Sequence, residues 1–277
     1  MMGRRRDALL AAAGMVLSGA LPAAAPPNGL GWFAWQAGPW LADPQALLER
    51  LPTPSSRILL GLDAAQLAQA ATLGGDAPIL RLVKLASLRG VAVDLLLGDP
   101  EWVRPTARAH LMHLLGQLRH LPFAGLNLDI ERGQLSGIGV DAWRQGLLET
   151  VRQARATTDW PLTLTTHADD LVEPGFLRHL STSGAAVAIA MAYVSFPQLA
   201  LERTERILRA RAAGSAPLRI GLAQSIESQL ARGESWHRFG RNHALREWIQ
   251  LDTRLRRHAG FAGITIQSFE AFESASA

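Results

Sequence analysis

The feature that most constrains the fold of this sequence is a repeated alternation between short apolar runs and longer segments with helical spacing. The apolar runs span residues 31–35, 57–62, 91–97, 125–130, 162–166, 186–193, 218–223 and 263–266. Amphipathic segments such as 106–120, 140–156, 200–213 and 242–258 lie between them, with apolar residues three and four positions apart. The pattern therefore predicts eight strands, each followed by helical structure.

The apolar runs are continuous rather than alternating, which is typical of parallel strands buried on both faces by helices. Eight repeats within one domain length predict an α/β protein in which residues 26–277 form a single (β/α)8 TIM barrel. An open doubly wound sheet is the alternative. Residues 31–38 read Gly-Trp-Phe-Ala-Trp-Gln-Ala-Gly, which places tryptophans where a dinucleotide-binding loop needs bare backbone. We therefore predict no cofactor.

The first 25 residues have the pattern of a secretory signal peptide. Three arginines, Arg4–Arg6, precede an apolar stretch at 8–21, and three alanines, Ala23–Ala25, precede a proline. The apolar stretch is short and broken by glycine and proline, so we expect no stable membrane insertion of the mature chain. The prediction is a periplasmic or secreted protein, exported by the general or the twin-arginine route.

Composition excludes two classes of function. The chain has no cysteine, so disulfides and thiolate chemistry are unavailable and any nucleophile must be oxygen or nitrogen. The pI of about 10.7 is misleading, because the net charge of +4 falls to +2 once the three arginines and one aspartate of residues 4–7 are removed. We therefore expect no nucleic-acid partner.

The fourth apolar run carries a pair of carboxylates. Asn127, Asp129 and Glu131 alternate with apolar residues, so the two-residue period of a strand places all three on one face. In a barrel interior, repulsion between the two carboxylates should raise the pKa of one of them, which suits a general acid. The alternative is that they pair with an arginine such as Arg132 and only close the strand end.

This segment resembles the signature of family 18 glycoside hydrolases, chitinases and their relatives, in which the fourth strand reads Asp-Gly-x-Asp-x-Asp-x-Glu. Gly125, Asp129 and Glu131 match, whereas Ala124 and Asn127 replace two aspartates. The resemblance implies that Glu131 is the general acid and that Asp129 orients it and a substrate N-acetyl group.

A second segment, Met191-Ala192-Tyr193, is similar to the Met-x-Tyr of that family, whose tyrosine contacts the reacting sugar. Val194 stands where the family has an acidic or amide residue, and Gln267 replaces its tryptophan at the last strand end. The chain is thus interpreted as a distant relative, and chitin is not inferred as its substrate.

Other predicted strand ends are also rich in polar and aromatic residues. We expect Trp32, Trp35 and Trp102 to offer flat faces for sugar rings, with core or loop packing as the alternative for each. Further candidate substrate-binding residues at or near strand ends are Asp63, Asp99, Glu101, Asn127, His167, Tyr193, Gln224, Gln267 and Glu270.

Glu227 follows the seventh apolar run and is a rival catalytic group. A nucleophilic Glu227 about 5 Å from Glu131 would imply retention of configuration, and a separation of about 6.5–9.5 Å would imply inversion. The nucleophile is otherwise the N-acetyl group of the substrate.

The sequence disfavours two other chemistries. The side chains of Asp99, Glu101, Asp129, Glu131 and His167 offer ligands for a divalent ion, but no closely spaced histidine pair accompanies them, so no metal is predicted. No serine lies in a Gly-x-Ser-x-Gly elbow, which disfavours serine hydrolysis. His110, His113 and His120 are expected near the surface of one helix.

Together these features predict an exported glycoside hydrolase that cleaves a polysaccharide or oligosaccharide, with Glu131, Asp129 and Glu227 as catalytic residues. One alternative is a barrel that binds glycan without cutting it, and another is an assembly factor for an envelope polysaccharide.

Overall fold

The computed structural model describes residues 29–73 and 77–277, which form a closed barrel of eight parallel strands in sequence order. Its strands are β1 (Leu30–Ala34), β2 (Ser55–Gly61), β3 (Ala92–Gly98), β4 (Gly125–Asp129), β5 (Leu162–His167), β6 (Ala185–Met191), β7 (Arg219–Ser225) and β8 (Phe261–Gln267). The barrel closes where β1 pairs with β8, through Gly31 opposite Thr265 and Trp32 opposite Ile266. The eight predicted strands and the (β/α)8 fold are therefore confirmed, and the open-sheet alternative is wrong.

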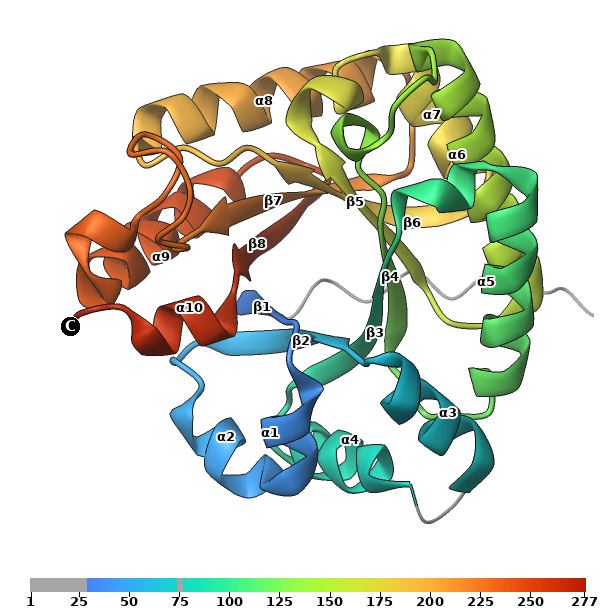
Figure 1. Cartoon of the computed structure of the whole chain (residues 1–277). Coiled ribbons are helices and arrows are strands. Elements are labelled where there is room, and N and C mark those ends of the chain that lie inside the picture. The colour runs from blue at the N-terminus through green and yellow to red at the C-terminus, as the bar shows by residue number, and fades with distance from the viewer. Residues whose placement is uncertain (1–28, 74–76) are drawn as a thin grey trace, which may run out of the picture.

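A ring of helices surrounds the barrel (Figure 1). They are α1 (Ala37–Ala42), α2 (Pro44–Arg50), α3 (Ala64–Leu73), α4 (Pro78–Leu88), α5 (Pro105–Leu118), α6 (Val140–Thr157), α7 (Pro174–Thr182), α8 (Pro197–Ala213), α9 (Arg241–Leu255) and α10 (Phe269–Ser274). Five of them, α2, α4, α5, α7 and α8, begin with proline, which suits the first turn because it has no N–H to leave unpaired. The four helical segments predicted at 106–120, 140–156, 200–213 and 242–258 correspond to α5, α6, α8 and α9.

The strands bury apolar side chains on both faces, and this explains their continuous apolar runs. Residues such as Leu60, Leu128 and Leu222 are completely buried in the layer between barrel and helices, whereas Phe33 and Leu59 belong to a separate cluster in the barrel interior. Because side chains alternate between the two faces of a strand, each strand delivers every second residue to the interior.

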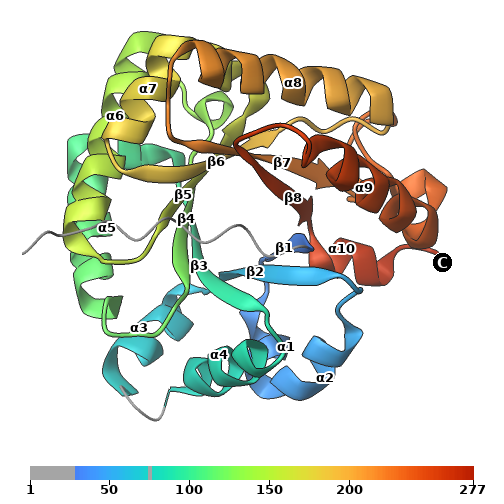
Figure 2. The same ribbon diagram turned by 180° about the vertical axis from the view of Figure 1, so that it is seen from behind.

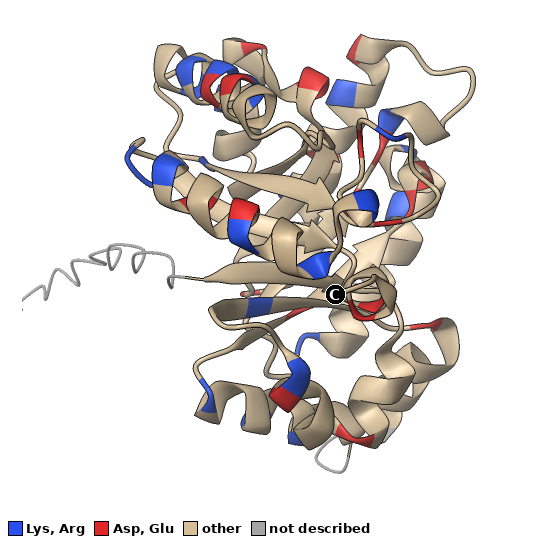
Figure 3. Cartoon of the chain, turned by 90° about the vertical axis from the view of Figure 1, so that its left-hand side faces the viewer, with Lys and Arg blue, Asp and Glu red and all other residues tan. Residues whose placement is uncertain are grey.

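All eight strands run in the same direction, so their carboxyl ends lie at one end of the barrel. Figures 2 and 3 show the molecule from behind and from the side, and acidic residues lie in several loops at the end to which the strand arrows point. His110, His113 and His120 are exposed, as predicted.

Within the described ranges, no helix combines the length and apolar character needed to cross a bilayer. The predicted signal peptide lies outside the described residues.

Candidate active site

Asp129 and Glu131 lie at the carboxyl end of the barrel, as the strand spacing predicted. Asp129 is the last residue of β4, and Glu131 precedes the short 3-10 helix η3 (Arg132–Gln134). The Asp129 side chain is only 9% exposed, and its Oδ1 atom is buried without a hydrogen-bond partner. A buried carboxyl oxygen without a hydrogen-bond partner lowers the stability of the folded protein, and such unfavourable groups are typical of functional sites.

The pKa of Asp129 is raised to about 7, chiefly by burial and secondly by the nearby charge of Glu131, while the charge of His167 lowers it. The sequence predicted that repulsion within the pair would raise one pKa. The structure adds that Asp129 is the residue concerned and that desolvation, not repulsion, is the larger cause. A carboxyl group that titrates near pH 7 can hold a proton for general acid catalysis at neutral pH.

Glu131 is held by two partners. His167 lies at the end of β5, and its Nε2 atom is 3.0 Å from Glu131 Oε2. Gln134 donates a hydrogen bond of 2.7 Å from Nε2 to Glu131 Oε1. The bond to Glu131 is the main cause that raises the pKa of His167, which favours an imidazolium–carboxylate pair.

Arg132 does not pair with the carboxylates, contrary to the alternative weighed for this strand end. Its Nε atom lies 3.1 Å from Oδ1 of Asp170, a buried residue of the 3-10 helix η4 (Ala168–Leu171). His167 therefore takes the place that an arginine was expected to fill beside Glu131.

Tyr193 lies two residues after the end of β6, at the same end of the barrel as the carboxylates. It packs against the interior cluster that contains Phe33 and Met191. Burial raises its pKa well above the ordinary value, and the charges of Asp129, Glu227 and Glu131 contribute in the same direction. These effects place the phenol within electrostatic reach of all three proposed catalytic carboxyls.

Glu227, in the loop after β7, is also partly buried. The Ser225 hydroxyl donates to Glu227 Oε2 at 3.2 Å, and Gln229 Nε2 donates to Oε1 at 3.2 Å. Burial raises the pKa of Glu227, whereas hydrogen bonds from Ser225, Gln229 and Gln267 lower it. Gln267, at the end of β8, thus contacts Glu227 as well.

Trp35 is the best placed of the predicted aromatic platforms. Its ring is 38% exposed and stacks on Phe33 with a centroid separation of 6.1 Å and an interplanar angle of 9°. A Cβ atom added to Gly98 would lie 3.4 Å from Trp35 Cη2 and 3.6 Å from Asp129 Cβ. The indole and the carboxyl therefore flank the same glycine, so a sugar ring that stacks on Trp35 would lie next to Asp129.

The prediction that Trp32 and Gln224 bind substrate is wrong. Trp32 is completely buried between barrel and helices, in edge-on contact with Trp248, Phe269 and Phe272, and cannot stack on a sugar. Gln224 is also completely buried. It donates to the Ala192 carbonyl and accepts from the indole N–H of a tryptophan in the following loop. In both cases the side chain points away from the barrel interior, because each follows an inward-facing residue in a strand.

The other predicted side chains have local partners. Asn127 is buried one layer below Asp129 and bonds to Thr165 Oγ1 at 3.0 Å. Asp63 and Asp99 accept hydrogen bonds from backbone N–H groups of the turns that follow them.

Three candidates remain near other strand ends. Glu101 pairs with Arg104 at 2.7 Å. Trp102 is partly buried against the outer core. Glu270 Oε1 accepts from the Gln36 backbone N–H at 3.0 Å, and its Oε2 is buried without a partner.

Sequence reasoning missed Gln134, Phe33 and the Arg132–Asp170 pair, all of which support the site from beneath or beside it. Their roles depend on a 3-10 turn and on interior packing, and neither of these produces a recognisable pattern in the neighbouring sequence.

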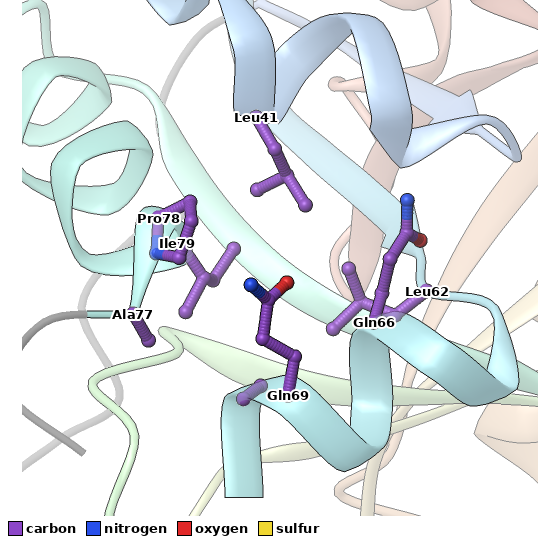
Figure 4. Close-up of a pocket in the computed structure, with 8 residues that line it drawn as sticks. Leu41, Leu62, Gln66, Gln69, Ala77, Pro78 and Ile79 are labelled. Atoms are coloured by element: carbon purple, nitrogen blue, oxygen red, sulfur yellow. The ribbon is translucent and has the colours of Figure 1, made fainter. Parts of the chain in front are cut away.

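Among residues 29–73 and 77–277, no three acidic, histidine or cysteine side chains are gathered around a point where a metal ion could bind. A water-sized cavity of about 10 Å³ lies outside the barrel between Leu41, Gln69 and Ile79 (Figure 4), which is too small for a sugar.

No protein-family model matches this chain, and no curated protein matches its sequence. Solved structures share its fold at low sequence identity. A protein designated a deoxyribose-phosphate aldolase from Toxoplasma gondii has a TM-score of 0.53 at 11% identity, covering 90% of this chain and 93% of its own. A family 20 glycoside hydrolase, a β-N-acetylglucosaminidase, has a TM-score of 0.51 at 12% identity, covering 91% of this chain and 67% of its own.

These comparisons show the fold and not the activity. The chain is a single-domain (β/α)8 barrel whose structural neighbours include a glycoside hydrolase among enzymes of other classes. They do not single out family 18.

Proposed function

We propose that this protein is a glycoside hydrolase that acts at the carboxyl end of its barrel. The observation that carries the proposal is the carboxyl pair there, in which buried Asp129 has a pKa of about 7 and Glu131 lies beside it. Most glycosidases cleave the glycosidic bond with two neighbouring carboxyl groups, one of which holds a proton.

In this proposal Asp129 holds a proton at neutral pH. Glu131, whose side chain is 22% exposed, is the member that reaches the glycosidic oxygen, and it protonates that oxygen with the proton that Asp129 passes to it. Tyr193 and Trp35 contact the sugar. Glu227 or a group of the substrate itself supplies the nucleophile.

Lysine chemistry is disfavoured as the alternative activity. An aldol reaction through a Schiff base requires a lysine amine at the site. The only lysine of the sequence is Lys84, which is exposed on α4, outside the barrel.

Charge at the strand ends favours an uncharged or amino-sugar chain over an anionic one. Carboxyl groups there belong to Asp63, Asp99, Glu101, Asp129, Glu131, Glu227 and Glu270. The nearby cations of Arg104 and Arg132 are already paired, with Glu101 and Asp170. A polyuronate would meet net repulsion here.

The test is to incubate the protein with labelled cellohexaose, chitosan hexamer and hexagalacturonate and to follow shortened products. Turnover of one of the first two is expected. Glu131→Gln and Asp129→Asn should each lower turnover by about 10²–10⁴-fold, whereas Glu202→Gln, a control at an exposed position on α8, should stay within about twofold. Full activity of Glu131→Gln would overturn the catalytic assignment.

A second candidate function is glycan binding without cleavage. It is favoured by one observation, the engagement of both Glu131 oxygens by His167 and Gln134. Binding of cellohexaose or chitosan hexamer by calorimetry, with no shortened product after prolonged incubation, would select this function.

We also propose that the protein is exported and cleaved after Ala25. Amino-terminal sequencing of the protein recovered from outside the cytoplasm should begin at Pro26, and an intact Met1 there would contradict the proposal.

A further inference from the structure

A second cavity, of about 360 Å³, opens at the amino-terminal end of the barrel, opposite the carboxyl pair. Its walls include the aliphatic side chains of Leu59, Val187 and Ile189. Gly31 and Gly221 line it as well, and they place no side chain in the barrel interior. The volume falls in the range of small-molecule sites, about 300–1,000 Å³.

Two arginines, Arg57 and Arg219, line this cavity. A third, Arg256, is not among the lining residues, and its Nη2 atom is buried. Burial lowers the pKa of Arg219, and the charges of Arg57 and Arg256 lower it further. Like charges therefore meet at this end of the barrel.

One of the three arginines has no carboxyl partner among the described residues. Arg57 pairs with Asp94, and Arg256 pairs with Asp252. Within the described part of the chain, Arg219 forms no ion pair and donates only a long bond of 3.4 Å, to the Ala262 carbonyl.

We propose that this cavity binds an amphiphilic carboxylate, with its head held by Arg219 beside Arg57 and its apolar chain against Leu59, Val187 and Ile189. The planar fork of guanidinium matches a carboxylate through two parallel hydrogen bonds. The aliphatic walls favour a hydrocarbon chain over a bare inorganic anion. This site is independent of the proposed glycosidase activity, which lies at the other end of the barrel.

Calorimetric titration of the intact protein with octanoate tests the proposal, with 1-octanol and acetate as the apolar and anionic halves of the probe. Octanoate should bind with 1:1 stoichiometry and at least about tenfold more tightly than either half. Equal binding by octanol would show an apolar cavity with no anion site. Equal binding by acetate would show an anion site with no apolar requirement. Either result overturns the proposal.

Two variants locate the binding. Arg219→Gln should weaken octanoate binding at least about tenfold, whereas Arg203→Gln, an exposed arginine on α8, should leave it within about twofold. Val187→Phe keeps all three arginines and fills the cavity, so it should abolish binding even if Arg219→Gln does not fold. Undiminished binding by a folded Arg219→Gln or by Val187→Phe would refute the site.

Discussion

Replacing Asp129 by asparagine should stabilise the protein at alkaline pH while it lowers activity. The pKa of Asp129 is about 7 in the folded protein, against 3.8 for an ordinary aspartate. This difference of about three pH units corresponds to about 4 kcal/mol. Because the folded state resists ionisation, wild-type stability from this group is fully present below pH 3.8 and is lost as the pH rises to about 7.

Asparagine cannot ionise, so the variant escapes this loss. With these two pKa values, the penalty on the wild type is about 2 kcal/mol at pH 5 and about 4 kcal/mol at pH 8. The free energy of unfolding of Asp129→Asn, relative to wild type, should therefore increase by about 2–3 kcal/mol between pH 5 and pH 8.

Urea denaturation of Asp129→Asn and wild type at pH 5 and pH 8 measures how the difference in their free energies of unfolding changes with pH. Asp159→Asn, at an exposed position just before β5, is the matched control and should show no such change. A difference between Asp129→Asn and wild type that is the same at both pH values would show that Asp129 is not a neutral acid in the folded protein.

Three further predictions concern its surroundings. In His167→Gln the pKa of Asp129 should rise further, because the charge of His167 lowers that pKa in the wild type. The alkaline limb of the pH–activity profile should therefore move to higher pH. A limb that does not move would contradict this coupling. Trp32→Ala should lower the free energy of unfolding by about 3–5 kcal/mol in urea titrations, since its ring is completely buried, and a loss below about 1 kcal/mol would contradict its core role. Trp35→Ala should instead weaken oligosaccharide binding about tenfold by calorimetry with less effect on stability, and unchanged affinity would remove Trp35 from the binding surface.

The sequence by itself determined the fold, because the signal is repeated. Eight continuous apolar runs separated by helical spacing admit few arrangements other than parallel strands covered by helices. The period of two within β4 likewise placed Asn127 and Asp129 on one face, and it predicted Glu131, two residues beyond the strand end, beside them.

The tertiary structure decided what those residues contact. Trp32 and Trp35 are three positions apart in the sequence, yet one is buried beneath the helices and the other is exposed at the barrel mouth. The partner of Glu131 is His167, from the neighbouring strand, and not the adjacent Arg132. Burial and the fields of distant charges set pKa values, and both exist only once strands far apart in the sequence have closed into a barrel. The two arginines that line the cavity at the opposite end, from β2 and β7, became visible for the same reason.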